Sequence, residues 1–389
     1  MSRRRSFLVS TTSTCSPPVT SLPASRNGGS TWRSASSSVA ATVRQLAVRA
    51  FTLFGVLLAV LLLLVISLGA TGYSDNLLRA QVSEETRALR QSLSQTIRDP
   101  AELERTVAGR QAEIERFYGL DTPWYQRLPP AVLRVLRLDL GEARSLRTAD
   151  GSREVGAIVR ERLPYTMLLL TTSSLVTAVA GLVVGVRMAT RAGGRLDRGV
   201  AYFAAISFAV PAWWLGILFI LVFAFQLQWL PSGGMLSTPP PVAGWDRVRD
   251  LVWHALLPVL TIVVVSVGPY IYTVRTMTLS VAQEDHVLLA RAKGLPERQI
   301  TSRHILRVAA PPIVTGLVLG LAGSLSGSIL VETIFNWQGM GRLYFDAVGA
   351  LDEGVIVALT FIFTLLYVLL RFLLDILYVL LDPRVRLAS

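Results

Sequence analysis

Cysteine, lysine and histidine are almost missing from this chain. Its 389 residues include one cysteine, Cys15, one lysine, Lys293, and three histidines. A single cysteine excludes an intramolecular disulfide framework and any multi-cysteine metal site. Charged residues are also scarce, at 16%, whereas hydrophobic residues make up 52%. This balance is too apolar for a soluble domain of this size and indicates a protein that crosses a membrane several times.

Sequence motifs for nucleotide binding and hydrolytic chemistry are also missing. The chain has no Gly-x-x-x-x-Gly-Lys-Ser/Thr loop for ATP phosphates, no His-Glu-x-x-His and no Gly-x-Ser-x-Gly. His254, His286 and His304 lie at loops or span ends without metal-ligand spacing, so we expect interface or capping roles for them. We therefore expect no catalytic residue, no metal and no cofactor. An intramembrane enzyme and a receptor-like membrane protein remain the alternatives to a transport protein.

Six long apolar runs are present, and each is long enough to cross a membrane as a helix. We predict an all-α polytopic membrane protein with a long external loop between the first and second helices. A cytoplasmic loop lies between the fourth and fifth. The six runs are residues 51–68, 165–186, 200–225, 256–274, 311–331 and 355–374.

The chain divides into five predicted segments along these runs. They are a disordered basic cytoplasmic tail (1–44), a first transmembrane helix (45–72), an external and largely helical region (73–163), a five-helix core (164–383) that contains a coupling loop (276–310), and a second cytoplasmic tail (384–389).

Arginines set the predicted orientation. Arg187, Arg195 and Arg198 crowd the short loop after the second run, which places this loop in the cytoplasm. Both termini are then cytoplasmic and the protein is a multi-pass component of the cytoplasmic (inner) membrane. Arginine in such loops accounts for the net charge of +12, so we expect no nucleic-acid partner.

The external region should contain two amphipathic helices. Apolar residues recur at helical spacing on both sides of Asp99-Pro100, where the pattern breaks. The members of this pattern are Val82, Leu89, Leu93, Ile97, Leu103, Val107 and Ile114.

Several residues within the runs predict bends, close packing or a polar pathway. Pro211, beside Trp214, should kink the third span because proline removes a helix hydrogen bond. Gly320 and Gly323 in the fifth run are small residues that allow close helix packing, with lining of a pathway as the alternative. Glu332 ends this run. In the sixth, Arg371 and Asp375 have the spacing of an i,i+4 ion pair.

The most polar stretch of the second half is 284–312, between the fourth and fifth runs. Its apolar residues fit a short helix that should end at Gly294, because glycine accepts the left-handed conformation at a helix end. Pro296 suits the first turn of a second helix. We therefore expect a compact helix-turn-helix between two membrane spans, which a partner protein can bind.

Ala290 to Leu295, Ala-Arg-Ala-Lys-Gly-Leu, resembles the coupling loop, or EAA loop, of ABC importer permeases of the dipeptide/oligopeptide/nickel type. Further similar stretches occur in the same order, at 118–123, 254–258 and 335–341. Two positions depart from the family pattern: Leu288-Leu289 replaces the Glu-Ala of other branches, and Gln338 stands where proline is usual.

The resemblance implies the membrane-spanning subunit of an ATP-driven importer of peptides or related small solutes, by alternating access. Its implied partners are a second permease subunit, cytoplasmic ATPase subunits, an external substrate-binding protein and membrane lipid. The implied ATPase-coupling residues are Glu284, Leu288, Leu289, Ala290, Ala292, Lys293, Gly294 and His304, and the residues expected to line the pathway or pack are Pro211, Trp214, Gly320, Gly323 and Glu332.

Overall fold

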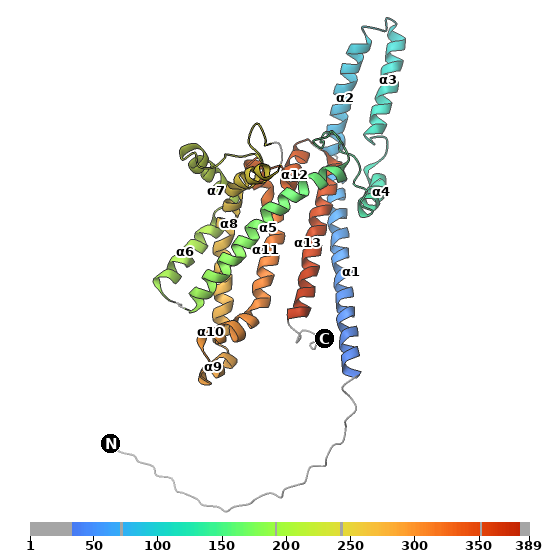
Figure 1. Cartoon of the computed structure of the whole chain (residues 1–389). Helices are drawn as coiled ribbons and strands as arrows, with labels where there is room; N and C mark the ends of the chain where they lie inside the picture. The colour runs from blue at the N-terminus through green and yellow to red at the C-terminus, as the bar shows by residue number, and fades with distance from the viewer. Residues whose placement is uncertain (1–32, 71–72, 191–192, 242–243, 351, 382–389) are drawn as a thin grey trace, which may run out of the picture.

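The structure, a computed structural model, describes residues 33–70, 73–190, 193–241, 244–350 and 352–381 (Figure 1). Expectations about residues 1–32 and 382–389 therefore concern segments outside the described residues. The described elements are helical: α1 (Arg33–Ala70), α2 (Tyr73–Leu93), α3 (Pro100–Phe117), α4 (Trp124–Leu136), α5 (Val155–Thr190), α6 (Arg195–Ala209), α7 (Ala212–Phe219), the π-helix η1 (Ile220–Gln226), α8 (Trp245–Ala282), α9 (Asp285–Ala292), α10 (Glu297–Gln299), the π-helix η2 (Ile300–Ile305), α11 (Leu306–Ile334), α12 (Met340–Gly349) and α13 (Glu353–Leu381).

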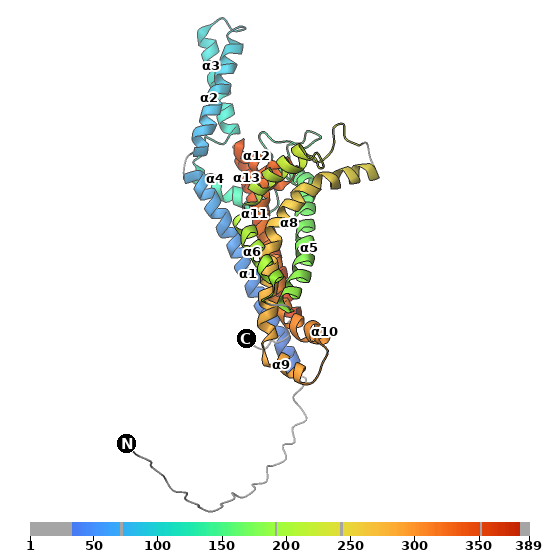
Figure 2. The ribbon, with the colours of Figure 1, turned by 90° about the vertical axis from the view of Figure 1, so that its left-hand side faces the viewer.

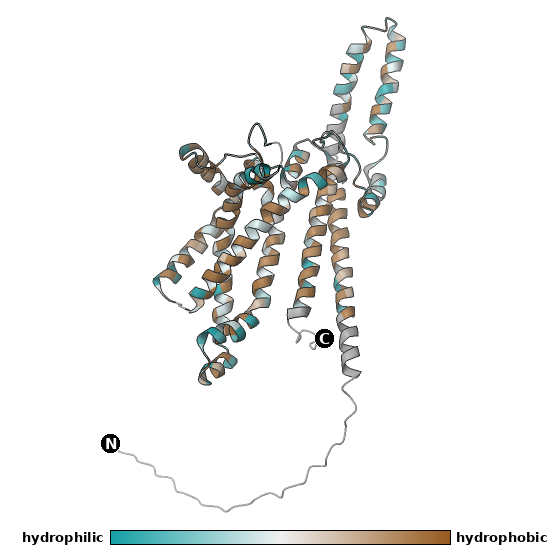
Figure 3. Ribbon diagram, in the orientation of Figure 1, coloured by the Kyte–Doolittle hydropathy of each residue, from teal (hydrophilic) through white to brown (hydrophobic). Residues whose placement is uncertain are grey.

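Within the described residues, five helical segments are long and apolar enough to cross a membrane, or six if one bent pair counts as a single span. They run side by side in Figure 1, and Figure 3 shows apolar residues along their length. Each predicted run lies within one long helix or, for 200–225, within the bent pair and η1, although α5 begins ten residues before the run at 165–186. α1 begins at Arg33, so residues 33–44, for which disorder was expected, are helical.

The bent pair is the predicted third span. α6 and α7 meet at Pro211 with a bend of 100°. Val210 is extended, because the residue before a proline is pushed out of the helical region, and Pro211 caps α7. The predicted kink is therefore a complete break of the helix.

α5 and α8 approach closely, and two glycines make this possible. A Cβ on Gly185 would lie 2.8 Å from the Val274 Cβ, and one on Gly181 would overlap the ring of Tyr270. Small residues four apart let helix backbones come together. The Gly-x-x-x-Gly spacing at 181–185 thus has the packing role that was expected at Gly320 and Gly323.

α2 and α3 form an antiparallel hairpin that stands away from the helical bundle (Figures 1 and 2). α3 begins at the predicted Asp99-Pro100, where the Asp99 side chain accepts a hydrogen bond from the Ala101 N–H. The break itself starts earlier, because α2 ends at Leu93, and Ile97 of the predicted pattern lies between the two helices. Apolar residues of both helices face each other, with Val82 and Val107 buried, while the outer faces are polar (Figure 3). At about 1.5 Å per residue, the 21 residues of α2 extend roughly 30 Å.

The hairpin and α12 lie at one end of the bundle, called the hairpin end; α9, α10 and η2 lie at the other, called the loop end (Figure 1). At the hairpin end α12 packs with the first turns of α5 and α13. Their shared core contains Val155, Ile158, Val159, Met340, Leu343, Ala347, Val355 and Leu359. α1 packs on α13 and α4 through Leu57, Leu61, Val135 and Phe361.

Candidate functional site

The first candidate site is the short helix α9 with the turn that ends it. Gly294 has φ +71°, the left-handed conformation predicted for it. Its N–H donates to the Arg291 carbonyl, and the Leu295 N–H donates back to the Ala290 carbonyl. These two bonds form a Schellman motif, which satisfies the carbonyls at the helix end within the turn itself. The sharp reversal after α9 is therefore fixed locally, as the sequence predicted.

α9 has an inner and an outer face with opposite environments. Val287 and Ala290 are buried among residues of α8, η2 and α11, including Val281, Ile300, Ile305, Ala309 and Ile313. Leu288 and Leu289 are 52% and 57% exposed. The inner face anchors α9 to two membrane-spanning helices, and the outer face exposes two leucines on the surface of the subunit.

Polar contacts hold the rest of this loop. The carbonyl of Glu284 accepts the N–H groups of Val287 and Leu288 at the start of α9. Arg291 Nε donates to Glu297 Oε1 at 3.1 Å, which ties α9 to α10. His286 Nε2 lies 3.1 Å from the His304 carbonyl, so this histidine connects α9 to η2.

The eight predicted coupling residues are thus close in space but not equivalent. Glu284, Leu288, Leu289, Ala292, Lys293 and Gly294 are exposed, and His304 is half-buried in η2. Ala290 is buried against the chain's own helices and does not face outward.

The loop end also contains a buried ion pair that the sequence analysis missed. Arg275 of α8 donates to both carboxylate oxygens of Asp197 in the first turn of α6, and Nη2 lies 2.7 Å from Oδ2. The Gly193 N–H also donates to Asp197, at 2.9 Å. Two parallel donors on one carboxylate fix geometry as well as charge, so this pair joins α6 to α8 beside the loop.

Four of the predicted pathway or packing residues face away from the chain's own core. Trp214 is exposed in α7, beside Pro211. A Cβ on Gly320 or Gly323 would meet nothing within 4 Å outside its own helix backbone. Within the part of the chain that the structure describes, these glycines therefore make no packing contact with another helix.

Glu332, the fifth, is fully buried at the hairpin end. Its Oε1 accepts the Thr166 hydroxyl of α5 at 2.8 Å. Its Oε2 accepts the N–H groups of Gly341 and Arg342 at 2.7 and 3.0 Å, in the first turn of α12. Glu332 therefore joins three helices.

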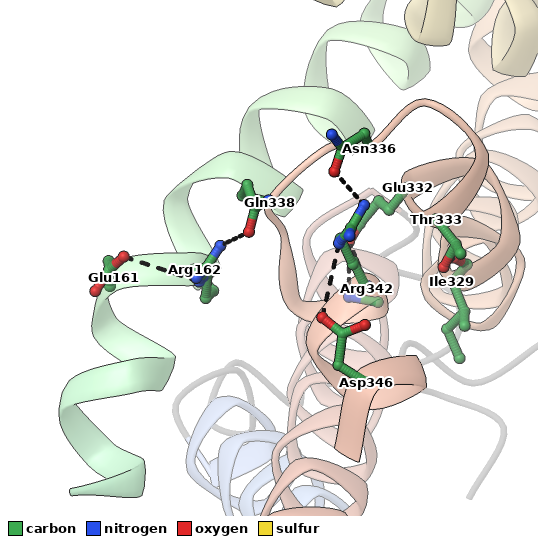
Figure 4. A network of polar contacts seen from close by, with 10 residues as sticks. Glu161, Arg162, Ile329, Glu332, Thr333, Asn336, Gln338, Arg342 and Asp346 are labelled. Atoms are coloured by element: carbon green, nitrogen blue, oxygen red, sulfur yellow. Dashed lines mark hydrogen bonds and ion pairs between the residues drawn. The ribbon is translucent and has the colours of Figure 1, made fainter. Parts of the chain in front are cut away.

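Charged and amide side chains surround this carboxylate in Figure 4. The Arg342 guanidinium is directed to Asn336 and Asp346, and Arg162 of α5 donates to Gln338. Sequence reasoning found Glu332 but none of these partners. Thr166 is 166 residues away, and only the paired glycines at 339 and 341 hint that a backbone comes close.

Among the described residues, no three His, Cys, Asp or Glu side chains gather as metal ligands would. The loop end has two exposed leucines on an anchored helix, which can contact a partner. The hairpin end has a buried carboxylate at a helix N-terminus, which can hold that helix in position.

Comparison with known proteins gives this arrangement a family. A profile of the binding-protein-dependent transport system inner membrane components matches residues 181–387. The chain is 30% identical over 278 residues to the oligopeptide transport system permease protein AppB of Bacillus subtilis, which covers 71% of this chain and 85% of that protein. It is 32% identical over 289 residues to the di/tripeptide transport system permease protein DppB of Pseudomonas aeruginosa, covering 71% and 84%.

A third relative is the oligopeptide transport system permease protein OppB of Mycobacterium bovis, 32% identical over 276 residues and covering 69% of this chain and 83% of that one. Among solved structures, an inward-facing methionine ABC transporter, MetNI, matches with a TM-score of 0.46 at 19% identity, over 58% of this chain and 97% of the other. The chain belongs to the binding-protein-dependent transport system inner membrane components, as a permease subunit of an ABC importer and not as an enzyme.

Proposed function

We propose that this permease carries peptides and that α9 is the element through which ATPase subunits drive it. The observation that carries the proposal is the pair of exposed leucines, Leu288 and Leu289, on a helix whose inner face is anchored to α8 and α11. A short helix laid in a groove is a common mode of docking. A push on α9 would reach α8 and α11 directly because Val287 and Ala290 are packed between them.

The substrate class is proposed from the relatives. The three named above are permeases for oligopeptides or di- and tripeptides. Nothing in their names or in this chain favours the intramembrane enzyme or the receptor-like protein considered from the sequence.

The loop end is proposed to be cytoplasmic and the hairpin end external, with both termini in the cytoplasm. The support is the arginine excess of the loop between α5 and α6, which lies at the loop end (Figure 1). A single cysteine at Ser92 on the hairpin, in a Cys15→Ser chain, should react with an impermeant thiol reagent in cells with a permeable outer layer. Labelling only after lysis would overturn this orientation.

A second permease subunit is proposed to cover the open face of α11. Val308, Pro312, Leu319, Gly320, Gly323 and Leu330 recur along one side of this helix and are exposed in the single chain. Two such faces opposite each other would enclose a pathway that opens to alternate sides. An external substrate-binding protein would then deliver the peptide at the hairpin end.

The test of the proposed function is purification of the tagged chain together with the products of neighbouring genes. An ATPase should co-purify with the chain, and peptide uptake into proteoliposomes should require ATP. Replacing Ala292, which is exposed at the end of α9, by aspartate should release the ATPase while leaving membrane insertion intact. Full ATPase association in Ala292→Asp and in Leu288→Asp would show that α9 is not the coupling element.

A further inference from the structure

Glu332 is a buried carboxylate without a cation. Its side chain is fully buried, and no ion pair to it occurs among the described residues. Arg342, whose N–H binds this carboxylate, directs its guanidinium to Asn336 and Asp346 instead (Figure 4). Burying an unpaired charge is costly unless hydrogen bonds replace its water. The role of Glu332 is therefore inferred from the groups that donate hydrogen bonds to it.

These bonds come from the N-terminus of α12 and from two hydroxyl side chains. Besides the N–H groups of Gly341 and Arg342, the carboxylate accepts the hydroxyls of Thr166 and Ser328. Thr166 Oγ1 also accepts the Met340 N–H, at 2.7 Å. The first three N–H groups of α12, which no carbonyl of the helix can reach, are thus all bound by α5 and α11 side chains.

Two glycines let the helix come this close. A Cβ on Gly339 would overlap Glu332 Oε2 and lie 2.5 Å from Thr166 Oγ1. A Cβ on Gly341 would lie 2.7 Å from the Ile329 Cα. The backbone of α12 begins directly on the carboxylate, with no space for a side chain between them.

We propose that Glu332 is a positioning residue for transport, which holds α12 against α5, α11 and α13 at the hairpin-end mouth of the proposed pathway. The proposal rests on the proposed function, because it places the mouth where the peptide enters. α12 follows α11 after a short turn, so a movement of α11 driven from α9 would reach α12 through this carboxylate. Without it, the N–H groups of Gly341 and Arg342 would lose their hydrogen bonds to α11, and the first turn of α12 would keep only the bond from the Met340 N–H to Thr166.

The role depends on hydrogen-bond acceptors at this point and not on a proton passing through the site. In Glu332→Gln, the amide oxygen can accept the Gly341 and Arg342 N–H groups, and the amide N–H can donate to Thr166 Oγ1. The Thr166 hydroxyl can then turn to a carbonyl of its own helix. In Glu332→Ala, both N–H groups and the Thr166 hydroxyl lose their acceptor.

The experiment measures the position of α12 by thiol labelling of the assembled importer purified in lipid nanodiscs. The parent is Cys15→Ser with Ala347→Cys, because Ala347 is fully buried on the inner face of α12. Val348→Cys in the same background is the matched control, because Val348 is 46% exposed on the outer face. Nanodiscs expose both membrane sides, so the result does not depend on the proposed orientation.

Glu332→Ala should raise the labelling rate of the cysteine at 347 at least tenfold and leave the rate at 348 within twofold. In proteoliposomes made with the same Glu332→Ala importer, peptide uptake should fall at least tenfold while the ATPase remains bound. Glu332→Gln should stay within twofold of the parent in labelling and uptake. Unchanged labelling at 347 in Glu332→Ala, or equal losses in the Ala and Gln variants, would overturn the proposal.

A second pair of variants covers the case in which Glu332→Ala does not fold. Thr166→Val removes the acceptor of the Met340 N–H and should raise labelling at 347, whereas Thr166→Ser should not. Labelling that rises while uptake stays normal would also overturn the transport role. Loss of ATPase co-purification from the parent would instead count against the proposed function and leave the labelling result standing.

Discussion

The two ends of this permease satisfy their helix termini in opposite ways. At the loop end α9 closes with bonds between neighbours, from Gly294 to Arg291 and from Leu295 to Ala290, and it leaves Leu288 and Leu289 outside. At the hairpin end α12 begins on side chains of two other helices, and its inner face is buried. The loop end is self-contained and exposed, which suits docking, while the hairpin end is held by distant partners, which suits a part that must keep its place.

The same contrast predicts which substitutions should lower the stability of the isolated subunit and which should affect only its binding to partner subunits. Exposed apolar residues contribute nothing to the isolated fold until a partner covers them. Buried hydrogen bonds stabilise the fold whether or not a partner is present. The following predictions use this difference, from the largest expected effect to the smallest.

Replacing Leu288 and Leu289 together by aspartate should abolish ATPase binding without unfolding the permease. Burial of a leucine side chain is worth about 1.5–3 kcal/mol, so loss of two corresponds to more than a hundredfold in affinity. Binding is measured by titrating purified ATPase onto the permease in nanodiscs. Gln283→Asp, an exposed position just before α9, is the control and should bind normally. Equal loss in the control would mean that charge, and not the leucine face, was responsible.

Gly339→Ala should destabilise the subunit itself. The added methyl has no space beside Glu332 and Thr166, and overpacking of this kind costs about 1–3 kcal/mol, in addition to displaced hydrogen bonds. The thermal unfolding midpoint of the purified subunit should fall by several degrees. Gly320→Ala is the matched control, because its methyl enters open space on α11 and should leave the midpoint unchanged. Equal unfolding midpoints for the two variants would show that the backbone of α12 is not packed against Glu332 and Thr166 as closely as described.

Gly294→Val should weaken coupling moderately. A β-branched residue in the left-handed region costs about 1–2 kcal/mol, while no atom lies near enough to clash with the added carbon. Peptide uptake per ATP hydrolysed should fall several-fold as α9 loses its fixed end. Asparagine tolerates this conformation, so Gly294→Asn should retain most of the coupling. If Gly294→Val transports as much peptide per ATP as Gly294→Asn, the turn at Gly294 is not needed for coupling.

Arg87→Ala on the hairpin should have almost no effect. Arg87 pairs with Glu84 at 3.4 Å, but both side chains are 77% exposed, and exposed pairs contribute about 0.2–1 kcal/mol or less. Unfolding and uptake should match the parent within error. A clear loss of uptake with normal folding would instead indicate that this face of the hairpin contacts a partner.

The sequence predicted what depends on neighbours in the chain. The helix start at Asp99-Pro100, the stop at Gly294 and the interruption at Pro211 follow from the residues at those positions and are present in the structure. Whether the six runs form six spans, with the bent pair as one, stays a prediction.

The features that depend on distant residues could not be read in the same way. The partners of Glu332 lie on α5 and α12, and helical spacing alone did not show that Ala290 turns inward. The predicted Arg371–Asp375 pair is not formed among the described contacts, and one oxygen of Asp375 is buried without a hydrogen-bond partner. Gly320 and Gly323 were expected to pack or to line a pathway, and which of the two they do stays a prediction. Within the described chain it is Gly181 and Gly185 that allow close helix packing, because the neighbour of each helix is set by the whole fold.

The central claim is that the exposed face of α9 is where the ATPase meets the permease. It is tested most directly by placing a photo-crosslinking amino acid singly at Leu288 and at Val348 in the assembled importer. The account predicts a crosslink to the ATPase from position 288 and none from position 348, which is exposed at the opposite end. A crosslink to the ATPase from 348, or none from 288 in a complex that hydrolyses ATP, would contradict it.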